Sequence, residues 1–465
     1  MTEPHLDRPH SGSPCAAPSP QPVDGAASAA PGLRVAVGNV GCKLNQHEVE
    51  ALSQGFDRRG YRVVGPREPA DVVVVNTCTV TGAGDADSRR AVRRARRDNP
   101  RAAVVATGCY AQRCPDDLRQ AGADLVVGNA DKARLIEHLE AHLRGDATPA
   151  VDPSSRPRAT EFLTIEGPVP GGRTRGTLKI QDGCDEHCTY CIIPSVRGPG
   201  VSRPQEEVLE QARLMVQAGY RELALTGVHS GSYGWDREQP EALVRLLEAL
   251  DRLPGLERIR LNSVEPAYVT DALIDFAASS AHFCRHMHIP MQSGDDAVLR
   301  RMGRRYTRAH YAERVHRLAG AIPDCALGAD VMVGFPGETE AQYAASVDLV
   351  DGLPLTYLHV FAYSAREGTA AARLEGHHTR ATKSARSRRL IALGQAKRLA
   401  FHRRHLDRRV RVLVEDRRDA ASGLAVGLTD NYIKVLLDGP SRANQIVEAR
   451  VTRAREDLVL GELAP

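Results

Sequence analysis

The sequence predicts an α/β protein in three parts: an N-terminal open parallel α/β sheet, a central partial TIM-like barrel and a small C-terminal β-barrel. A chain of 465 residues is long enough for about three domains. Short β-type runs alternate with helical stretches over residues 33–143 and again over 173–402, a pattern typical of parallel sheets. Alternating apolar positions separated by Gly and Asn turns follow in 403–465, as expected of a small barrel.

The first 32 residues are rich in Pro, Ala and Ser and are predicted to form a disordered tail. They lack the positive n-region and the apolar h-region of a secretory signal. No apolar run approaches the roughly 20 residues needed to span a bilayer. Ten cysteines in such a chain favour metal or redox chemistry over disulfides, with Cys15 interpreted as incidental. We therefore expect a cytoplasmic protein with no membrane partner.

Cysteines follow three of the strands predicted in the N-terminal part, which are Arg34–Gly38, Asp71–Val75, Ala102–Ala106 and Leu125–Val127. These are Cys42, Cys78 and Cys109. Because parallel strands end at a common edge, the three thiols are expected at one rim, where they can hold an iron–sulfur cluster. Cys114 competes with Cys109 but lies further past its strand, before Pro115. Simple burial of each thiol is the alternative.

Residues 144–172 are rich in Pro, Gly, Thr and Ser and are predicted to link two domains. Six strands are predicted beyond this segment: Gly176–Ile180, Glu222–Thr226, Ile259–Asn262, His286–Ile289, Ala329–Val333 and Leu358–Ala362. Six βα units predict an open or partial TIM-like barrel, whose functional residues lie at the carboxyl ends of the strands. Cys184, Cys188 and Cys191 follow the first strand at that end.

These last three cysteines form the segment Gly-Cys-Asp-Glu-His-Cys-Thr-Tyr-Cys. Iron–sulfur clusters normally take four thiolates, so three close thiolates can leave one iron open to a small molecule. A structural zinc site is the alternative, but its candidate fourth ligand, His187, lies inside the motif and cannot easily converge with the flanking cysteines. The spacing, with an aromatic residue before the last cysteine, resembles the signature of the radical S-adenosylmethionine (SAM) enzymes. The resemblance implies that SAM binds the open iron.

The net charge of the whole chain is only +4, but one segment is strongly basic. Residues 380–411 contain twelve Lys or Arg and one acid, Asp407, and six more arginines lie between Arg89 and Arg97. Basic stretches of this density suggest contacts with nucleic-acid phosphates, and a solvated helix face is the alternative. Together with the β-barrel that follows it, the 380–411 segment is predicted to form an RNA-binding platform. A purely structural β-module is the other interpretation.

With two three-cysteine sites and a terminal β-barrel, the chain resembles the methylthiotransferases of the radical SAM superfamily over nearly its whole length from Leu33. The resemblance implies an N-terminal methylthiotransferase α/β domain (33–143), a radical SAM barrel (173–402) and a TRAM-like RNA-binding domain (403–465). It also implies two [4Fe–4S] clusters, an auxiliary one on the first three cysteines and a SAM-binding one on the other three. The auxiliary ligands are Cys42, Cys78 and Cys109, and the SAM-binding ligands are Cys184, Cys188 and Cys191.

Three shorter motifs resemble the branch of this family that modifies N6-threonylcarbamoyladenosine in tRNA. They are Gly41–Glu50, Asn76–Thr81 and Arg304–Thr307. The resemblance implies that one SAM methylates a sulfur species at the auxiliary cluster. A second SAM is cleaved to the radical that activates C2 of the adenine beside the anticodon.

Expected partners are therefore tRNA, SAM and an electron donor such as flavodoxin or ferredoxin, and the protein is expected to be a monomer. Two alternatives keep the family: action on isopentenyladenosine in tRNA, or on a ribosomal protein. The others are a radical SAM enzyme of a different kind with an auxiliary cluster, such as a sulfur-inserting synthase, and a non-catalytic RNA-binding iron–sulfur protein.

Loop residues Glu265, Gln292 and Arg305 are candidates for contacting SAM or the substrate, with strand-end capping and surface charge as the alternatives. His286 and His288 alternate along a predicted strand, and we interpret them as barrel-lining or core residues rather than as metal ligands. No catalytic acid or base is predicted from the sequence.

Overall fold

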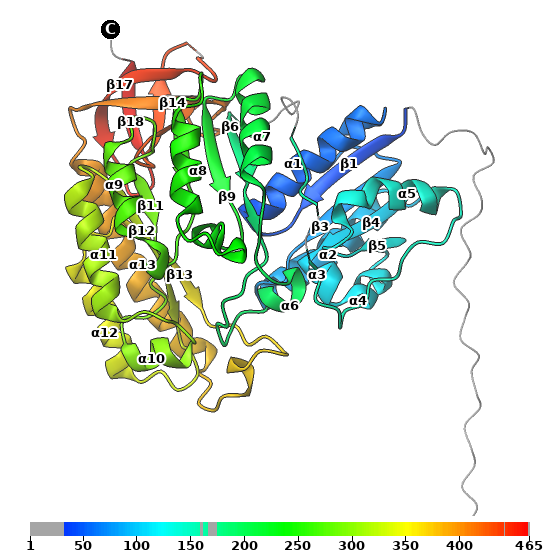
Figure 1. Cartoon of the computed structure of the whole chain (residues 1–465), viewed down its shortest axis with the longest axis horizontal. Helices are drawn as coiled ribbons and strands as arrows, with labels where there is room; N and C mark the ends of the chain where they lie inside the picture. Colours follow the sequence, from blue (N-terminus) through cyan, green and yellow to red (C-terminus); the bar gives the residue numbers. More distant parts are fainter. Residues whose placement is uncertain (1–31, 159–160, 166–173, 441, 464–465) are drawn as a thin grey trace, which may run out of the picture.

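A computed structural model describes residues 32–158, 161–165, 174–440 and 442–463, and these form a three-part α/β molecule (Figure 1). The predicted fold class is confirmed. The predicted tail, apart from Gly32, lies outside the described residues, as do Cys15 and parts of the predicted linker. In the part of the chain that the structure describes, none of the helices has the length and apolar character needed to cross a membrane.

The N-terminal part is a five-stranded parallel sheet in the order β2-β1-β3-β4-β5. Its elements are β1 (Arg34–Asn39), α1 (Lys43–Arg58), β2 (Arg62–Val64), β3 (Val72–Thr77), α2 (Gly82–Asp98), β4 (Ala103–Gly108), α3 (Cys109–Arg113), α4 (Pro115–Gln120), β5 (Leu125–Val127) and α5 (Leu135–Leu143). The all-valine run of β3 is buried on both faces, as expected of a central strand between two helical layers. The sequence missed β2, a three-residue edge strand with little buried surface.

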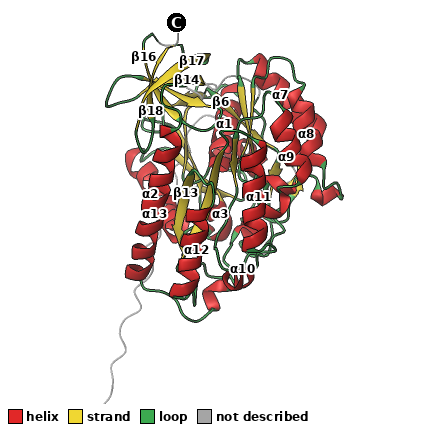
Figure 2. Ribbon diagram, turned by 90° about the vertical axis from the view of Figure 1, so that its left-hand side faces the viewer, coloured by secondary structure: helices red, strands yellow, loops and turns green. Residues whose placement is uncertain are grey.

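The central part contains the six predicted strands, and its helices cover the outer face of these strands (Figure 2). Its elements are β6 (Arg175–Lys179), β7 (Gln181–Asp182), α6 (Ile193–Arg197), β8 (Val201–Ser202), α7 (Gln205–Gln217), β9 (Glu222–Thr226), α8 (Ala242–Asp251), β10 (Arg258–Leu261), α9 (Asp271–Ser279), β11 (His286–His288), α10 (Asp296–Arg301), α11 (Arg308–Ala321), β12 (Ala326–Val333), α12 (Glu340–Gly352), β13 (Tyr357–Ala362) and α13 (Arg380–Arg403).

These strands pair in parallel as β10-β9-β6 and β11-β12-β13, and the two halves are connected by an isolated bridge between Ile259 and Phe283 and by a hydrogen bond from Val264 N to His288 O. Among the described residues, β6 and β13 do not pair with each other, so the barrel is open. The cysteine loop of the central part follows β6 and β7 at the carboxyl end of the strands.

The C-terminal part is a closed barrel in the order β14-β15-β16-β18-β17. Its strands are β14 (Arg409–Arg418), β15 (Ala425–Thr429), β16 (Lys434–Asp438), β17 (Ile446–Ala454) and β18 (Val459–Leu463). Two buried arginines of β10, Arg258 and Arg260, donate to carbonyl groups of this barrel and pair with Glu222 at the start of β9. The small barrel therefore docks at the amino ends of the central strands, opposite the cysteine loop.

Candidate active site

Three adjacent strands carry the first group of cysteines. Cys42 caps α1 after β1, Cys78 follows β3, and Cys109 begins α3 after β4. The strand order places β1, β3 and β4 side by side, so the three loops leave the same edge of the sheet. Burial first, and then the neighbouring Cys109 and Cys42 thiols, raise the pKa of Cys78 to about 11. The three thiols therefore converge, as the sequence predicted. We refer to them as the N-terminal triad.

Glycine makes this convergence possible. Gly41, directly before Cys42, has a φ of +101°, and a Cβ there would lie 2.7 Å from the Sγ of Cys78. Cys78 and Cys109 are buried, whereas Cys42 is reachable from solvent. Cys114, the competitor of Cys109, lies between α3 and α4, and burial and the Asp117 and Asp85 carboxylates raise its pKa. Cys109 is thus the third member of the triad by position.

The second group, Cys184, Cys188 and Cys191, is called here the barrel triad. Burial raises the pKa of Cys184 and of Cys188 to about 12, and the other thiols of the group add to the effect. The Cys184 amide donates to Gly198 O (3.0 Å), and the Thr189 hydroxyl donates to Arg301 O (2.8 Å). These bonds hold the loop against the barrel. His187, within the loop, is exposed.

The distances between the sulfurs of a triad indicate whether a single metal ion could be bound by all three. A Zn–S bond of about 2.3 Å limits two sulfurs on one ion to about 4.6 Å apart. Within the described residues, the one group whose ligand atoms all lie within 4.8 Å of one another is His288, Asp330 and His359, and it includes no cysteine. In neither triad, therefore, do all three sulfurs lie within the reach of a single zinc ion. This finding disfavours the structural-zinc alternative.

The two triads lie close together across the boundary between the N-terminal and central parts. Cys109 packs against Ile192 and Val196, which belong to the segment directly after the barrel triad. The pKa of Cys191, raised mainly by burial, is also affected by the charge of Cys109. The segment that follows the barrel triad and a thiol of the N-terminal triad therefore pack against each other.

Among the loop candidates, Glu265 acts electrostatically on Cys188 and pairs with Arg304, a residue that the sequence analysis missed. Its carboxylate is 2.6 Å from the guanidinium of buried Arg304, whose charge acts on Cys188. Arg305, the predicted residue, is largely exposed, and its Nε is 3.8 Å from the Glu186 carboxylate. Only burial distinguishes these adjacent arginines, and the sequence carried no signal of it.

The backbone of Gln292 connects two segments of the barrel. It is buried with a φ of +59°, and its amide donates to Asp330 O while its carbonyl accepts from Met332 N. It thereby joins the loop after β11 to β12. No side-chain hydrogen bond assigns it to a ligand.

The interior of the barrel contains a polar cluster. His286 and His288 are buried there, and the Tyr357 hydroxyl lies within 3.0 Å of a ring nitrogen of each. His288 Nε2 is also 2.9 Å from Asp330 Oδ1, and His359 Nδ1 lies 3.3 Å from the same oxygen. Partial burial would raise the pKa of the Asp330 carboxyl, but the neighbouring imidazoles hold it below its usual range. Hydrogen bonds within the cluster account for its close spacing.

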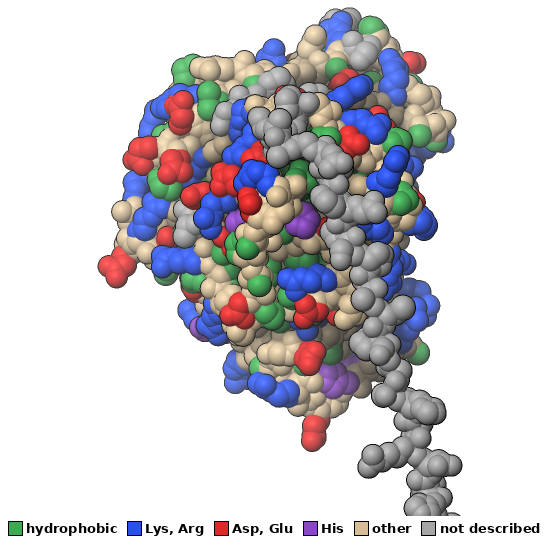
Figure 3. Space-filling view, turned by 90° about the vertical axis from the view of Figure 1, so that its right-hand side faces the viewer, with side chains coloured by type: hydrophobic (Ala, Val, Ile, Leu, Met, Phe, Trp, Pro, Cys, Tyr) green, Lys and Arg blue, Asp and Glu red, His purple; other side chains and the backbone are tan. Residues whose placement is uncertain are grey.

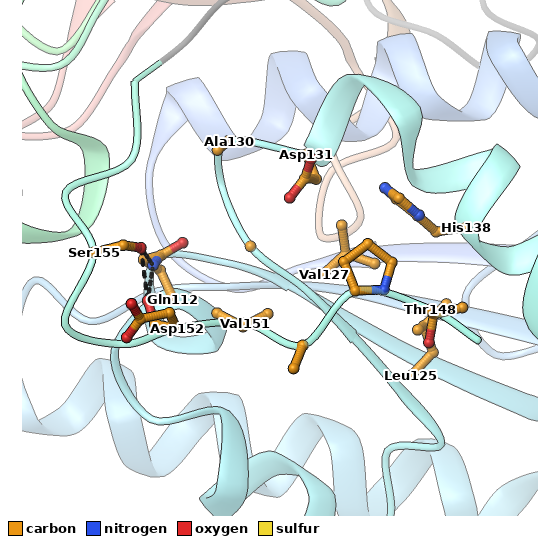
Figure 4. A pocket seen from close by; sticks show the side chains of 13 residues that line it. Gln112, Leu125, Val127, Ala130, Asp131, His138, Thr148, Val151, Asp152 and Ser155 are labelled. Carbon is orange, nitrogen blue, oxygen red and sulfur yellow. Dashed lines mark hydrogen bonds between the residues drawn. The ribbon is translucent and has the colours of Figure 1, made fainter.

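A pocket on the N-terminal part does not belong to this site. It lies between β5, α5 and residues 148–155, and its lining contains none of the six cysteines (Figure 4). Gln112 donates from Nε2 to Asp152 O (3.0 Å) beside it. Further along, Ile165 is buried in the barrel core. The described portions of the predicted linker are therefore packed against both neighbouring parts.

The basic segment 380–411 contains structural and exposed side chains. Arg386 is buried 2.6 Å from the Glu338 carboxylate, and Lys383 and Lys397 donate to backbone carbonyl groups. The exposed members are Arg380, Arg388, Arg389, Arg403, Arg404, Arg408, Arg409 and Arg411. Fewer basic side chains are therefore available to a partner than the twelve in the sequence of this segment.

The arginines of α2 are mostly neutralised. Four of the six contact carboxylates of the N-terminal part. Figure 3 shows basic and acidic side chains interspersed over the face of the molecule that it draws. The solvated-face interpretation therefore suits α2 better than a phosphate-binding surface.

Models of three families match the chain: the uncharacterized protein family UPF0004 over residues 34–128, the radical SAM superfamily over 178–350 and the TRAM domain over 403–464. The chain is 39% identical over 425 residues to the threonylcarbamoyladenosine tRNA methylthiotransferase MtaB of Bacillus subtilis (strain 168), covering 90% of this chain and 94% of that one. The MtaB of Aquifex aeolicus (strain VF5) is 36% identical, covering 90% and 100%.

A tRNA-2-methylthio-N(6)-dimethylallyladenosine synthase of Frankia casuarinae is 36% identical over 398 residues, covering 83% of this chain and 73% of that one. Among solved structures, the radical SAM methyltransferase TsrM from Kitasatospora setae is similar, with a TM-score of 0.55, 18% identity and coverage of 73% and 77%. The likeness to TsrM shows a shared fold.

Proposed function

This chain belongs to the MtaB-type methylthiotransferases of the radical SAM superfamily, and from that premise we propose that it methylthiolates C2 of N6-threonylcarbamoyladenosine beside the anticodon of tRNA. The observation that carries the proposal is the proximity of the two thiol triads, since Cys109 of one packs against the segment that follows the other. Family relatives named for dimethylallyladenosine make that base the second candidate substrate.

The cofactors are SAM and [4Fe–4S] clusters, as in the rest of the family. When bound, they supply the radical and the sulfur chemistry that no side chain provides. We assign the SAM-binding cluster to Cys184, Cys188 and Cys191 and the auxiliary cluster to Cys42, Cys78 and Cys109. In each case three thiolates leave one iron for a further ligand. Arg304, fixed by Glu265, places a positive charge beside Cys188, and it joins Glu265, Gln292 and Arg305 as a candidate SAM or substrate contact.

Helix α13 provides a route for tRNA between the cysteine-bearing rim and the small barrel (Figure 2). It begins beside Glu338 in the loop after β12, and near its end Phe401 packs in the core of the small barrel. Its 24 residues span about 36 Å at 1.5 Å per residue. Exposed arginines along it can bind phosphates and orient the stem while an extruded base reaches the rim.

Substrate choice is the first test. Purified, reconstituted enzyme is incubated with threonylcarbamoyl-tRNA, isopentenyl-tRNA and the small ribosomal subunit, and the products are measured by mass spectrometry. We expect methylthiolation of the threonylcarbamoyl substrate alone. Methylthiolation of only one of the other two would overturn the branch assignment, while no turnover of SAM on any of them would favour a non-catalytic RNA-binding protein.

Neutralising exposed arginines of α13 tests the RNA route. We expect the variant Arg388→Gln, Arg389→Gln, Arg403→Gln to bind tRNA more weakly whatever the tRNA sequence, and with a flatter salt dependence. The slope of log K against log salt should fall by about 0.7–0.9 for each phosphate that is no longer neutralised. Filter binding between low and high salt measures both quantities.

The matched control for this variant removes three exposed arginines on another face, one from α7, one from α8 and one directly after α8: Arg213→Gln, Arg245→Gln, Arg252→Gln. It changes the net charge equally and should leave the salt slope close to that of the parent. Equal slopes for both variants would show that α13 does not contact phosphates. SAM cleavage without RNA should survive in both.

We further propose that the enzyme acts as a monomer in the cytoplasm and takes electrons from a small carrier such as flavodoxin or ferredoxin. The support is that its substrate class is tRNA and that cluster-dependent SAM cleavage consumes one electron.

A further inference from the structure

A buried ionic network lies against the N-terminal triad. At its centre is Arg197, the last residue of α6, whose side chain is 2% exposed. Its guanidinium donates from Nη1 to Glu48 Oε1 (2.9 Å) and Asp182 Oδ1 (3.0 Å), and from Nη2 to Asn45 Oδ1 (3.1 Å). These partners come from both the N-terminal and the central parts, so Arg197 ties the two together.

The remaining donor of Arg197 points to a cluster ligand. Its Nε lies 3.1 Å from the Sγ of Cys109. Asn129 donates from Nδ2 to Val196 O (2.7 Å) next to this contact, which holds α6 against the same thiol. Because α6 directly follows the barrel triad, one short helix connects the segment of one triad to a sulfur of the other.

The charges of the network do not cancel. Lys132 and Lys179 join Arg197 on the basic side, while Glu48 and Asp182 are its carboxylates. With ordinary charges this leaves one surplus positive charge in a buried site, which is unfavourable unless an anion compensates it. A group held by three thiolates, one of them bonded to Arg197, provides that anion.

We propose that Arg197 is a positioning residue that raises the reduction potential of the auxiliary cluster through its hydrogen bond to Cys109 and its charge. This inference rests on the two-cluster function proposed above. Hydrogen bonds to cluster sulfurs and nearby positive charge both favour the more negative, reduced state. The effect is greatest where water is excluded, as it is around this guanidinium. The electron-accepting tendency of the auxiliary site is therefore set partly by a residue of the radical SAM domain.

The test uses full-length protein in which Cys184, Cys188 and Cys191 are replaced by Ala, so that only the auxiliary cluster is present. Its potential is measured by a redox titration followed by electron paramagnetic resonance. Three variants are compared in this background: Arg197→Gln, Arg197→Lys and Lys179→Gln. The last is the matched control, because Lys179 contacts the same two carboxylates without contacting a sulfur.

We expect Arg197→Gln to lower the equilibrium constant for reduction at least tenfold, which is about 59 mV for a one-electron couple. Arg197→Lys keeps the charge without the directed Nε bond and should give a smaller drop of the same sign. Lys179→Gln should change the constant less than Arg197→Gln does, although both remove one charge.

The outcomes separate this inference from the function that it rests on. If the background protein holds no cluster, the two-cluster proposal fails and this inference fails with it. If the cluster is present and its potential is unchanged in Arg197→Gln, or shifts equally in Lys179→Gln, only the role of Arg197 is overturned. If Arg197→Gln loses its cluster, Arg197→Lys decides: an unchanged potential, or loss of the cluster there too, would leave Arg197 with a purely structural role.

Discussion

Replacing Cys184, Cys188 and Cys191 together by Ala is expected to abolish SAM cleavage and to leave about four irons per chain, against about eight in the reconstituted parent with two cubanes. The three thiolates are the only protein ligands proposed for the SAM-binding iron, so their loss leaves SAM with no metal to chelate it. The measurements are iron content after anaerobic reconstitution and formation of 5′-deoxyadenosine under reducing conditions.

The matched control removes three other thiols, Cys114→Ala, Cys284→Ala and Cys325→Ala, and should keep both clusters and SAM cleavage. Cys284 and Cys325 are buried in the central part, away from both triads, so their loss should cost only some packing. An iron content unchanged by the first triple substitution would remove the basis for the radical SAM assignment of this loop.

Replacing Cys42, Cys78 and Cys109 by Ala is expected to spare reductive SAM cleavage and to stop methylthio transfer completely. The barrel triad and its anchoring bonds to Gly198 and Arg301 lie in the central part, so SAM can still bind there. Without the auxiliary site there is no group to carry the sulfur. Analysis of tRNA nucleosides and of 5′-deoxyadenosine in the same reaction separates the two activities.

Full methylthiolation by this variant would refute the auxiliary-cluster assignment. The single variants Cys109→Ala and Cys114→Ala sharpen the test, since Cys109 acts electrostatically on both Cys42 and Cys78, whereas Cys114 lies past the end of α3. We expect the first to lose transfer and the second to retain it. The reverse result would mean that α3 rearranges when the cluster binds.

Local signals were sufficient to predict the architecture. The six barrel strands and four strands of the N-terminal sheet are short runs rich in apolar residues, a signal that depends on sequence neighbours. The cysteines could likewise be placed at strand ends, because a parallel sheet brings all its carboxyl ends to one edge whatever the details of packing. The short edge strand β2 was missed because its three residues are mostly exposed and do not form a buried apolar run.

What only the tertiary structure decided concerns burial and contacts between distant segments. No sequence pattern distinguishes buried Arg304 from exposed Arg305, because the two are adjacent in one loop. Likewise, no pattern distinguishes the ion-paired Arg386 from its exposed neighbours on α13. Arg197 is 88 residues from Cys109 in the chain, and their contact depends on how α6 docks against the N-terminal sheet. The sequence by itself indicated which kind of cofactor this protein can bind, because the type and spacing of the ligands are local properties. The electrostatic environment of those ligands came only from the packing of one domain against the other.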